Sequence, residues 1–127
     1  MKLMQIAREF RDAYECVDSL DNEMMQWSLI DEEFREFEKA AQFEPDANTL
    51  KELADLVYVC MQYAANMGWD LDEALRLVHE SNMSKLGTDG KPLRRADGKV
   101  LKGPNYKKPD LSHLVDPNQP TIRAHWK

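Results

Sequence analysis

Residues 56–65, LVYVCMQYAA, decide the fold, because they place apolar side chains on nearly every side of a helix. An ordinary surface helix has a single apolar face, so this segment is predicted to form a central helix covered on several sides. We expect the helix to span residues 49–67 and to stop at Gly68, since glycine readily takes the left-handed conformation that ends helices.

Helical periodicity on both sides of this segment predicts three more helices. Apolar residues recur at three- and four-residue steps, and Pro45 ends the second helix because its ring clashes with the preceding turn. Asp70 and Glu73 resemble a capping box at the start of the last helix, and Gly87 is expected in the left-handed position after it. The predicted fold is all-α and resembles a four-helix bundle. The additional helices are expected at residues 3–20, 22–43 and 70–86.

The sequence after Gly87 is basic and rich in glycine and proline. Two Asp-Gly-Lys turns occur at residues 89–91 and 97–99, and the second predicts a short β-hairpin between its flanking segments. We therefore expect a helical core over residues 1–87 and a C-terminal extension over residues 88–127 that docks on the core as part of the same domain.

The net charge of −6 conceals an uneven distribution. Residues 1–84 carry 7 basic and 19 acidic side chains, whereas residues 85–127 carry 10 basic and 4 acidic ones. An acidic body argues against binding to a nucleic-acid polymer, which requires a basic face. Two interpretations remain equal on charge alone: a metal on the acids with a polyanion under the tail, or a tail that docks on its own acidic body.

Further features of the sequence favour a cytoplasmic protein. No window approaches the ~18 uninterrupted apolar residues of a membrane helix, and the first residues become charged too early for a signal peptide. Cys16 and Cys60 form no CxxC pair, so we expect them to be buried, reduced thiols.

Two pairs of acidic residues suggest a metal site. Glu33 and Glu36 are three residues apart on one predicted helix, and Glu52 and Asp55 are three apart on the next. Residues at this spacing share a helix face, so both pairs can turn toward one cleft. Carboxylates packed together repel one another unless a cation neutralises them, and oxygen ligands suit Mg²⁺ or Mn²⁺ better than zinc.

The spacing of these acids is equally compatible with a purely structural role. Thr49 and Glu52 also fit a capping box, with Asp55 favoured by the dipole of the helix N-terminus. Glu33 and Glu36 also fit a solvated helix face. A di-iron carboxylate bundle requires Glu-x-x-His motifs, and the sequence contains none, so we discard it.

The ordered set of motifs resembles the all-α NTP pyrophosphohydrolase superfamily of MazG-like proteins. That family's pattern, E-x-x-E followed by E-x-x-D, is matched by residues 33–36 and 52–55. Residues 78–87, VHESNMSKLG, resemble the family's late helix with its Asn and Lys. The basic tail is similar to that of a short branch described as phosphoribosyl-ATP pyrophosphohydrolase-like.

This resemblance implies a helical bundle that acts as a homodimer or homotetramer. It implies Mg²⁺, or Mn²⁺, on Glu33, Glu36, Glu52 and Asp55, with Glu32 holding an ion or the attacking water. The expected reaction converts a nucleoside triphosphate, (d)NTP, to (d)NMP and pyrophosphate. Hydrolysis of phosphoribosyl-ATP is the alternative among enzymes, and a non-catalytic helical oligomer or adaptor is the alternative outside them.

The resemblance also assigns substrate contacts. Asn82 is expected at a sugar hydroxyl or base edge and Lys85 at a phosphate, although a lysine in the last helical turn also favours the helix dipole. Trp27 either lines a base pocket or belongs to the core. Further predicted contacts lie in the tail, where the cations would clamp phosphates and the tyrosine would stack on a base or pin the tail: Lys91, Arg95, Lys102 and Tyr106.

Overall fold

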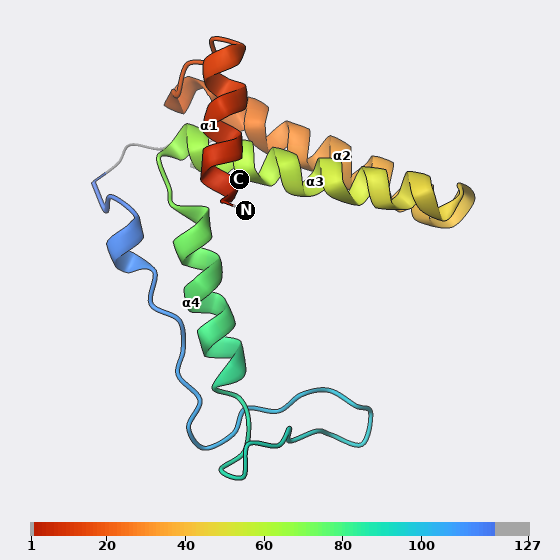
Figure 1. The fold of residues 1–127 in the computed structure, drawn as a ribbon, viewed down its shortest axis with the longest axis vertical. Coiled ribbons are helices and arrows are strands. Elements are labelled where there is room, and N and C mark those ends of the chain that lie inside the picture. The colour runs from red at the N-terminus through yellow and green to blue at the C-terminus, as the bar shows by residue number, and fades with distance from the viewer. Residues whose placement is uncertain (1, 119–127) are drawn as a thin grey trace. The chain divides into compact units, whose positions relative to one another are not determined.

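The computed structural model describes residues 2–118 and contains four α-helices. No β-strand occurs among these residues, so the predicted all-α fold is confirmed. No helix in the described part is long and apolar enough to cross a membrane. The helices are α1 (Leu3–Ala13), α2 (Glu23–Phe43), α3 (Asp46–Met67) and α4 (Leu71–Met83), with 3₁₀ turns at Leu20–Asn22 and Ser112–Leu114 (Figure 1).

The described chain divides into two compact units. Among the described residues, the first unit consists of residues 2–71 together with Asn118. The second unit runs from Asp72 to Pro117. The predicted division into a core over residues 1–87 and a docked extension over residues 88–127 stays a prediction. The last nine residues of the predicted extension, 119–127, lie outside the described part.

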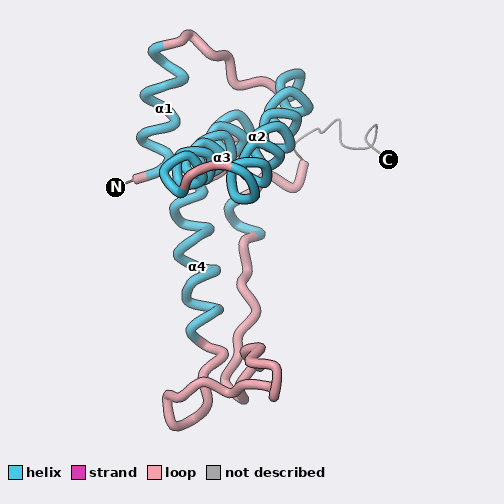
Figure 2. The backbone as a smooth tube through the Cα atoms, turned by 90° about the vertical axis from the view of Figure 1, so that its right-hand side faces the viewer, coloured by secondary structure: helices cyan, strands magenta, loops and turns pink. Residues whose placement is uncertain are grey.

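In the first unit, α2 and α3 form an antiparallel pair (Figures 1 and 2). Only Glu44 and Pro45 separate the two helices, so the chain must reverse within one short turn. The Thr49 hydroxyl donates a hydrogen bond of 3.1 Å to the carbonyl oxygen of Ala40, which is fully buried. This contact closes the turn and fixes how the helices align.

Helix α3 is central to the first unit, as predicted, because it contacts both α1 and α2. Its Met61 and Ala65 are buried with Ala7 of α1 in a small apolar core. The ring of Tyr58 meets Phe10 edge to face at 5.7 Å between ring centroids. Gly68 ends the helix at φ 76°, as expected.

The prediction for the first helix was too long. Helix α1 ends at Ala13, and Glu15 takes a left-handed φ of 54°. The backbone N–H of Cys16 then donates to the carbonyl oxygen of Arg11 at 2.8 Å, which turns the chain back on the helix. Periodicity over residues 3–20 could not reveal this turn, since Val17 fits the helical pattern and yet is 69% exposed.

A buried arginine explains the turn. The Arg11 side chain is only 2% exposed, and its Nε donates to Asp18 Oδ1 at 2.7 Å. Its two terminal nitrogens donate to Gln62 and Asn66 of α3 and to the carbonyl oxygen of Val17. A buried charge is tolerated only when it is paired and hydrogen-bonded, so the chain leaves the helical path to supply these acceptors.

Two other helix boundaries also differ from prediction. Helix α3 begins at Asp46, with Pro45 as its N-cap, three residues before the predicted start at Thr49. Helix α4 ends at Met83 instead of residue 86. The backbone N–H groups of residues 84–86 then donate hydrogen bonds to carbonyl oxygens three residues earlier, as in a 3₁₀ turn. Gly87 was expected to take the left-handed conformation and does not. The glycines of both Asp-Gly turns, Gly90 and Gly98, do take it.

In the second unit, the segment after α4 returns to the end of that helix. The backbone N–H of Gly103 donates to the carbonyl oxygen of Lys85 at 2.7 Å, and a Cβ on Gly103 would clash with the carbonyl oxygen of Leu86. The Ser81 hydroxyl donates to the carbonyl oxygen of Lys107 at 2.7 Å. Near the second turn, residues 94 and 100 form an isolated antiparallel bridge.

Asp18→Asn should destabilise the protein by about 1–3 kcal/mol, because it leaves the buried Arg11 guanidinium without its carboxylate. Burial alone would raise the pKa of Asp18, but hydrogen bonds from Arg8 and Arg11 lower it below 3.8. The folded state therefore gains stability from this carboxylate above its ordinary pKa and loses it as the pH falls through the lowered value. Urea denaturation between pH 7 and pH 2 should show this loss in the parent and not in the variant.

Asp12→Asn is the matched control, since Asp12 is an exposed partner of Arg8 at 3.6 Å. It should cost less than about 0.5 kcal/mol. Equal stability of Asp18→Asn and the parent at pH 7 would contradict the role assigned to the Arg11 network.

Candidate metal centre

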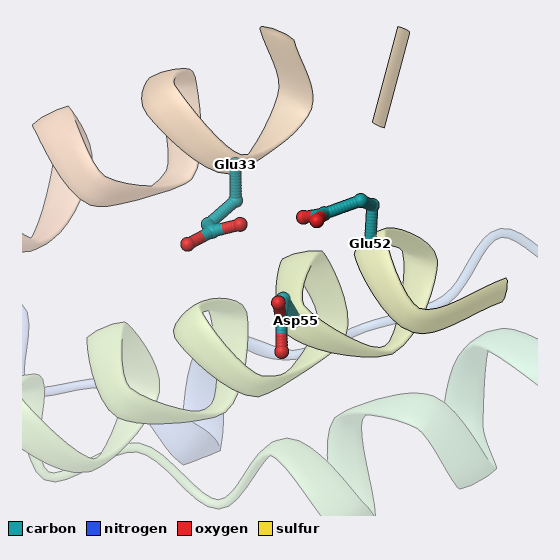
Figure 3. A group of neighbouring side chains, drawn as sticks. All are labelled: Glu33, Glu52 and Asp55. Carbon is teal, nitrogen blue, oxygen red and sulfur yellow. The ribbon is translucent and has the colours of Figure 1, made fainter. Parts of the chain in front are cut away.

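Three carboxylates from two helices converge in the first unit (Figure 3). Glu33 projects from α2 toward α3, where it meets Glu52 and Asp55. One oxygen atom from each side chain lies within 4.8 Å of the corresponding atoms of the other two. We call this group the acid cluster.

The antiparallel pairing of α2 and α3 places these residues together. Glu52 and Asp55 share one face of α3 because they are three residues apart. Glu33 lies on the same line of α2 as the buried Gln26 and Ala40, at steps of seven residues, which repeat a helix face. The acid cluster is therefore beside the helix–helix contact, and all three side chains are partly buried.

The capping alternative for Glu52 is wrong. Helix α3 begins at Asp46, so Thr49 lies inside the first turn, where it cannot serve as the N-cap. Its hydroxyl also donates to Ala40 of α2 instead of a backbone N–H of α3. Glu52 consequently has no partner in a capping box.

Lys51 is a residue of the site that the sequence interpretation missed. Its Nζ lies 2.7 Å from Asp55 Oδ2 and 3.3 Å from Glu52 Oε1. The spacing of four residues between Lys51 and Asp55 was the available signal, because such residues are neighbours on a helix surface. One ammonium thus accompanies three carboxylates.

The surroundings of Glu33 raise the pKa of its carboxyl group. Burial is the largest cause, followed by repulsion from the negative charges of Asp55 and Glu52. Lys51 opposes the rise, and Glu32 adds to it. The ionised form of Glu33 is therefore destabilised in the folded protein. A cation bound to the acid cluster would stabilise that form by offsetting the repulsion between the carboxylates.

Glu36 and Glu32 do not join the acid cluster. Glu36 is exposed, and its carboxylate is not among the oxygen atoms that converge, although it lies three residues from Glu33. Glu32 is also exposed. Neither forms an ion pair with another described residue, so both carboxylates are free to bind or orient a group from solvent.

The acid cluster fits a hard divalent cation. Every converging atom is a carboxylate oxygen, the ligand type that Mg²⁺ and Mn²⁺ prefer. No cysteine or histidine joins the group among the described residues, which disfavours zinc. Three negative charges against one lysine leave an excess that a divalent ion would neutralise.

Trp27 borders a small pocket and not the core. Its side chain is 48% exposed, and it lines a cavity of about 240 Å³ with Ile30, Asp31, Phe34 and Leu56. The residues that line this mostly apolar pocket belong to α2 and α3, the same two helices that supply the acid cluster. The role of Trp27 in binding a base stays a prediction.

The remaining predicted substrate contacts lie in the second unit. Asn82 is exposed and Lys85 is half-buried. In the tail, the Lys102 ammonium lies 4.8 Å from the centre of the Tyr106 ring, and Arg95 pairs with Asp97 at 2.7 Å. These pairings occupy one face of Tyr106 and the guanidinium of Arg95, while Lys91 is exposed. Their roles in substrate binding stay predictions.

A comparison with protein-family models matches residues 7–82 to the family described as phosphoribosyl-ATP pyrophosphohydrolase. The match covers more than half of the chain and includes the whole acid cluster and Asn82, whereas Lys85 and the tail lie beyond it. A comparison with curated proteins found no match. The chain thus belongs to the phosphoribosyl-ATP pyrophosphohydrolase family and is a metal-dependent nucleotide pyrophosphohydrolase.

Proposed function

We propose that the protein hydrolyses phosphoribosyl-ATP to phosphoribosyl-AMP and pyrophosphate, with Mg²⁺ held by the acid cluster. The convergence of Glu33, Glu52 and Asp55 within 4.8 Å carries the proposal. The family match favours phosphoribosyl-ATP over the (d)NTP substrates that the sequence pattern first suggested. Membership in an enzyme family also disfavours a purely structural role for the helices.

The chain's own residues would position the reactants. Glu33, Glu52 and Asp55 would hold the cation, and Glu36, whose exposed side chain is free to turn, is the proposed fourth ligand. Bound Mg²⁺ supplies a Lewis acid that offsets phosphate charge and makes water more acidic. Glu32, exposed beside Glu33, would orient the attacking water and accept its proton. The bond between the α- and β-phosphates breaks, and pyrophosphate leaves.

The Trp27 pocket supports recognition of a base. Its walls are mostly apolar, and an indole offers a flat surface on which a purine can stack. Because the pocket and the acid cluster lie on the same pair of helices, we propose that a nucleotide places its base against Trp27 and its phosphates near the carboxylates.

We also propose that the protein is a homo-oligomer. Leu50, Leu53 and Val57 form an apolar stripe on α3, and they are 66%, 41% and 46% exposed. Such a stripe on a helix that is apolar on several sides suits burial against a second copy of the chain.

Phosphoribosyl-ATP should give the highest kcat/KM in a screen of pyrophosphate release with Mg²⁺, by about tenfold or more over ATP, dATP and the other (d)NTPs. EDTA should stop the reaction. Products would be identified by chromatography and ³¹P NMR. Preference for a (d)NTP would replace the proposed substrate, and release of orthophosphate would contradict the reaction itself.

Glu33→Gln and Asp55→Asn should each lower kcat/KM on the order of 100-fold or more, because each removes a ligand charge from the acid cluster. Circular dichroism should show unchanged helicity. Glu38→Gln is the control, since Glu38 is an exposed carboxylate of the same helix outside the acid cluster. Activity within a few-fold of the parent in both cluster variants would remove these residues from the site.

Val57→Lys should reduce the molar mass measured by sedimentation equilibrium, because a lysine in the apolar stripe opposes burial. Val17→Lys is the matched control, as Val17 is 69% exposed on a loop outside the stripe. It should leave the mass unchanged. A monomeric parent, or equal masses for the parent and Val57→Lys, would refute the proposed interface.

A further inference from the structure

Lys51 places a positive charge on the same carboxylates that would bind a metal ion. Its Nζ contacts Asp55 Oδ2 at 2.7 Å and Glu52 Oε1 at 3.3 Å. Both contacts are short enough to be ion pairs, and the bridge between two acids makes them a small network instead of an isolated pair. Lys51 is therefore part of the electrostatic balance of the acid cluster.

This ammonium neutralises the acid cluster only in part. It pairs with the two carboxylates of α3, whereas no ion pair joins it to Glu33 of α2 in the described part of the chain. Repulsion from Asp55 and Glu52 still raises the pKa of Glu33 despite the opposing charge of Lys51. A single charge on a long side chain thus moderates the repulsion without removing it.

The ammonium and a divalent ion compete for the same two carboxylates, those of Glu52 and Asp55. A carboxylate oxygen that coordinates a cation at about 2.0–2.1 Å, the distance for Mg²⁺, brings that ion close to any ammonium held on the same group. The two positive charges then repel one another. Lys51 can leave easily, because its side chain is 66% exposed and its four-carbon stem is flexible.

We propose that Lys51 is an internal counter-cation that occupies Glu52 and Asp55 in the metal-free protein and is displaced when a divalent ion binds. This inference rests on the proposed function, which assigns the metal to the acid cluster. It follows that Lys51 stabilises the metal-free fold and weakens metal affinity, since its ion pairs must break first. The residue therefore sets the cation concentration at which the enzyme becomes loaded.

The test measures binding of Mn²⁺, added as MnCl₂, by isothermal titration calorimetry at low salt. Lys51→Met keeps the length of the side chain and removes its charge, so it should bind Mn²⁺ about threefold to tenfold more tightly than the parent. The same variant should melt at a lower temperature than the parent in EDTA, because Glu52 and Asp55 then lack their counter-cation.

Two further variants serve as controls. Lys51→Arg keeps the charge and should bind Mn²⁺ within about twofold of the parent. Lys39→Met removes a charge from an exposed position on α2 that makes no ion pair among the described residues, and it too should bind like the parent. Tighter binding by Lys39→Met equal to that of Lys51→Met would show a general charge effect and overturn the proposal.

The outcomes separate this inference from the proposed function. If the parent binds Mn²⁺ and Lys51→Met binds it equally or more weakly, the counter-cation role is wrong while the metal site stands. If the parent binds no Mn²⁺, the metal site fails and the role of Lys51 fails with it. Tighter binding by Lys51→Met, with reduced stability in EDTA, supports both.

Discussion

The antiparallel packing of α2 against α3 is the interaction on which the rest of the structure depends. Its turn contains only Glu44 and Pro45, and the hydrogen bond from Thr49 to Ala40 fixes the alignment of the helices beyond it. That alignment decides which residues of α2 face which residues of α3. A shift by one residue would rotate Glu33 by about 100° around its helix and away from Glu52 and Asp55. The geometry of the site is therefore a direct consequence of a two-residue connection.

The acid cluster sets an electrostatic problem that the helix pair must solve. Three carboxylates within 4.8 Å repel one another, and partial burial increases the cost of ionising Glu33. The protein tolerates this arrangement in part through Lys51 on the same helix as two of the acids. Under the proposed function, the remaining excess of negative charge would give the site its affinity for a divalent cation. Stability of the metal-free fold and affinity for the ion are thus opposed, which is common where a binding site requires charges to be held close together.

Much of this organisation could be predicted from the sequence, and the exceptions have physical causes. The periodic apolar residues indicated the number of helices and the central position of α3, and spacing placed Glu52 and Asp55 on one face. The early end of α1 was missed because a buried Arg11 requires acceptors from the following loop, and no periodicity encodes that requirement. The ion pairs of Lys51 lie within α3 and follow from spacing, but its effect on Glu33 depends on the pairing of α2 with α3, which spacing along one helix does not show. Glu36 follows the family motif, but its exposed carboxylate does not converge with those of the acid cluster.

The central claim is that α2 and α3 together hold the catalytic cation. Crystals grown with MnCl₂ and measured at the manganese absorption edge would test it most directly. The account predicts an anomalous peak bounded by the carboxylate oxygens of Glu33, Glu52 and Asp55, with the Lys51 ammonium no longer on Asp55. Manganese bound elsewhere on the chain, with Lys51 still paired to both acids, would contradict it.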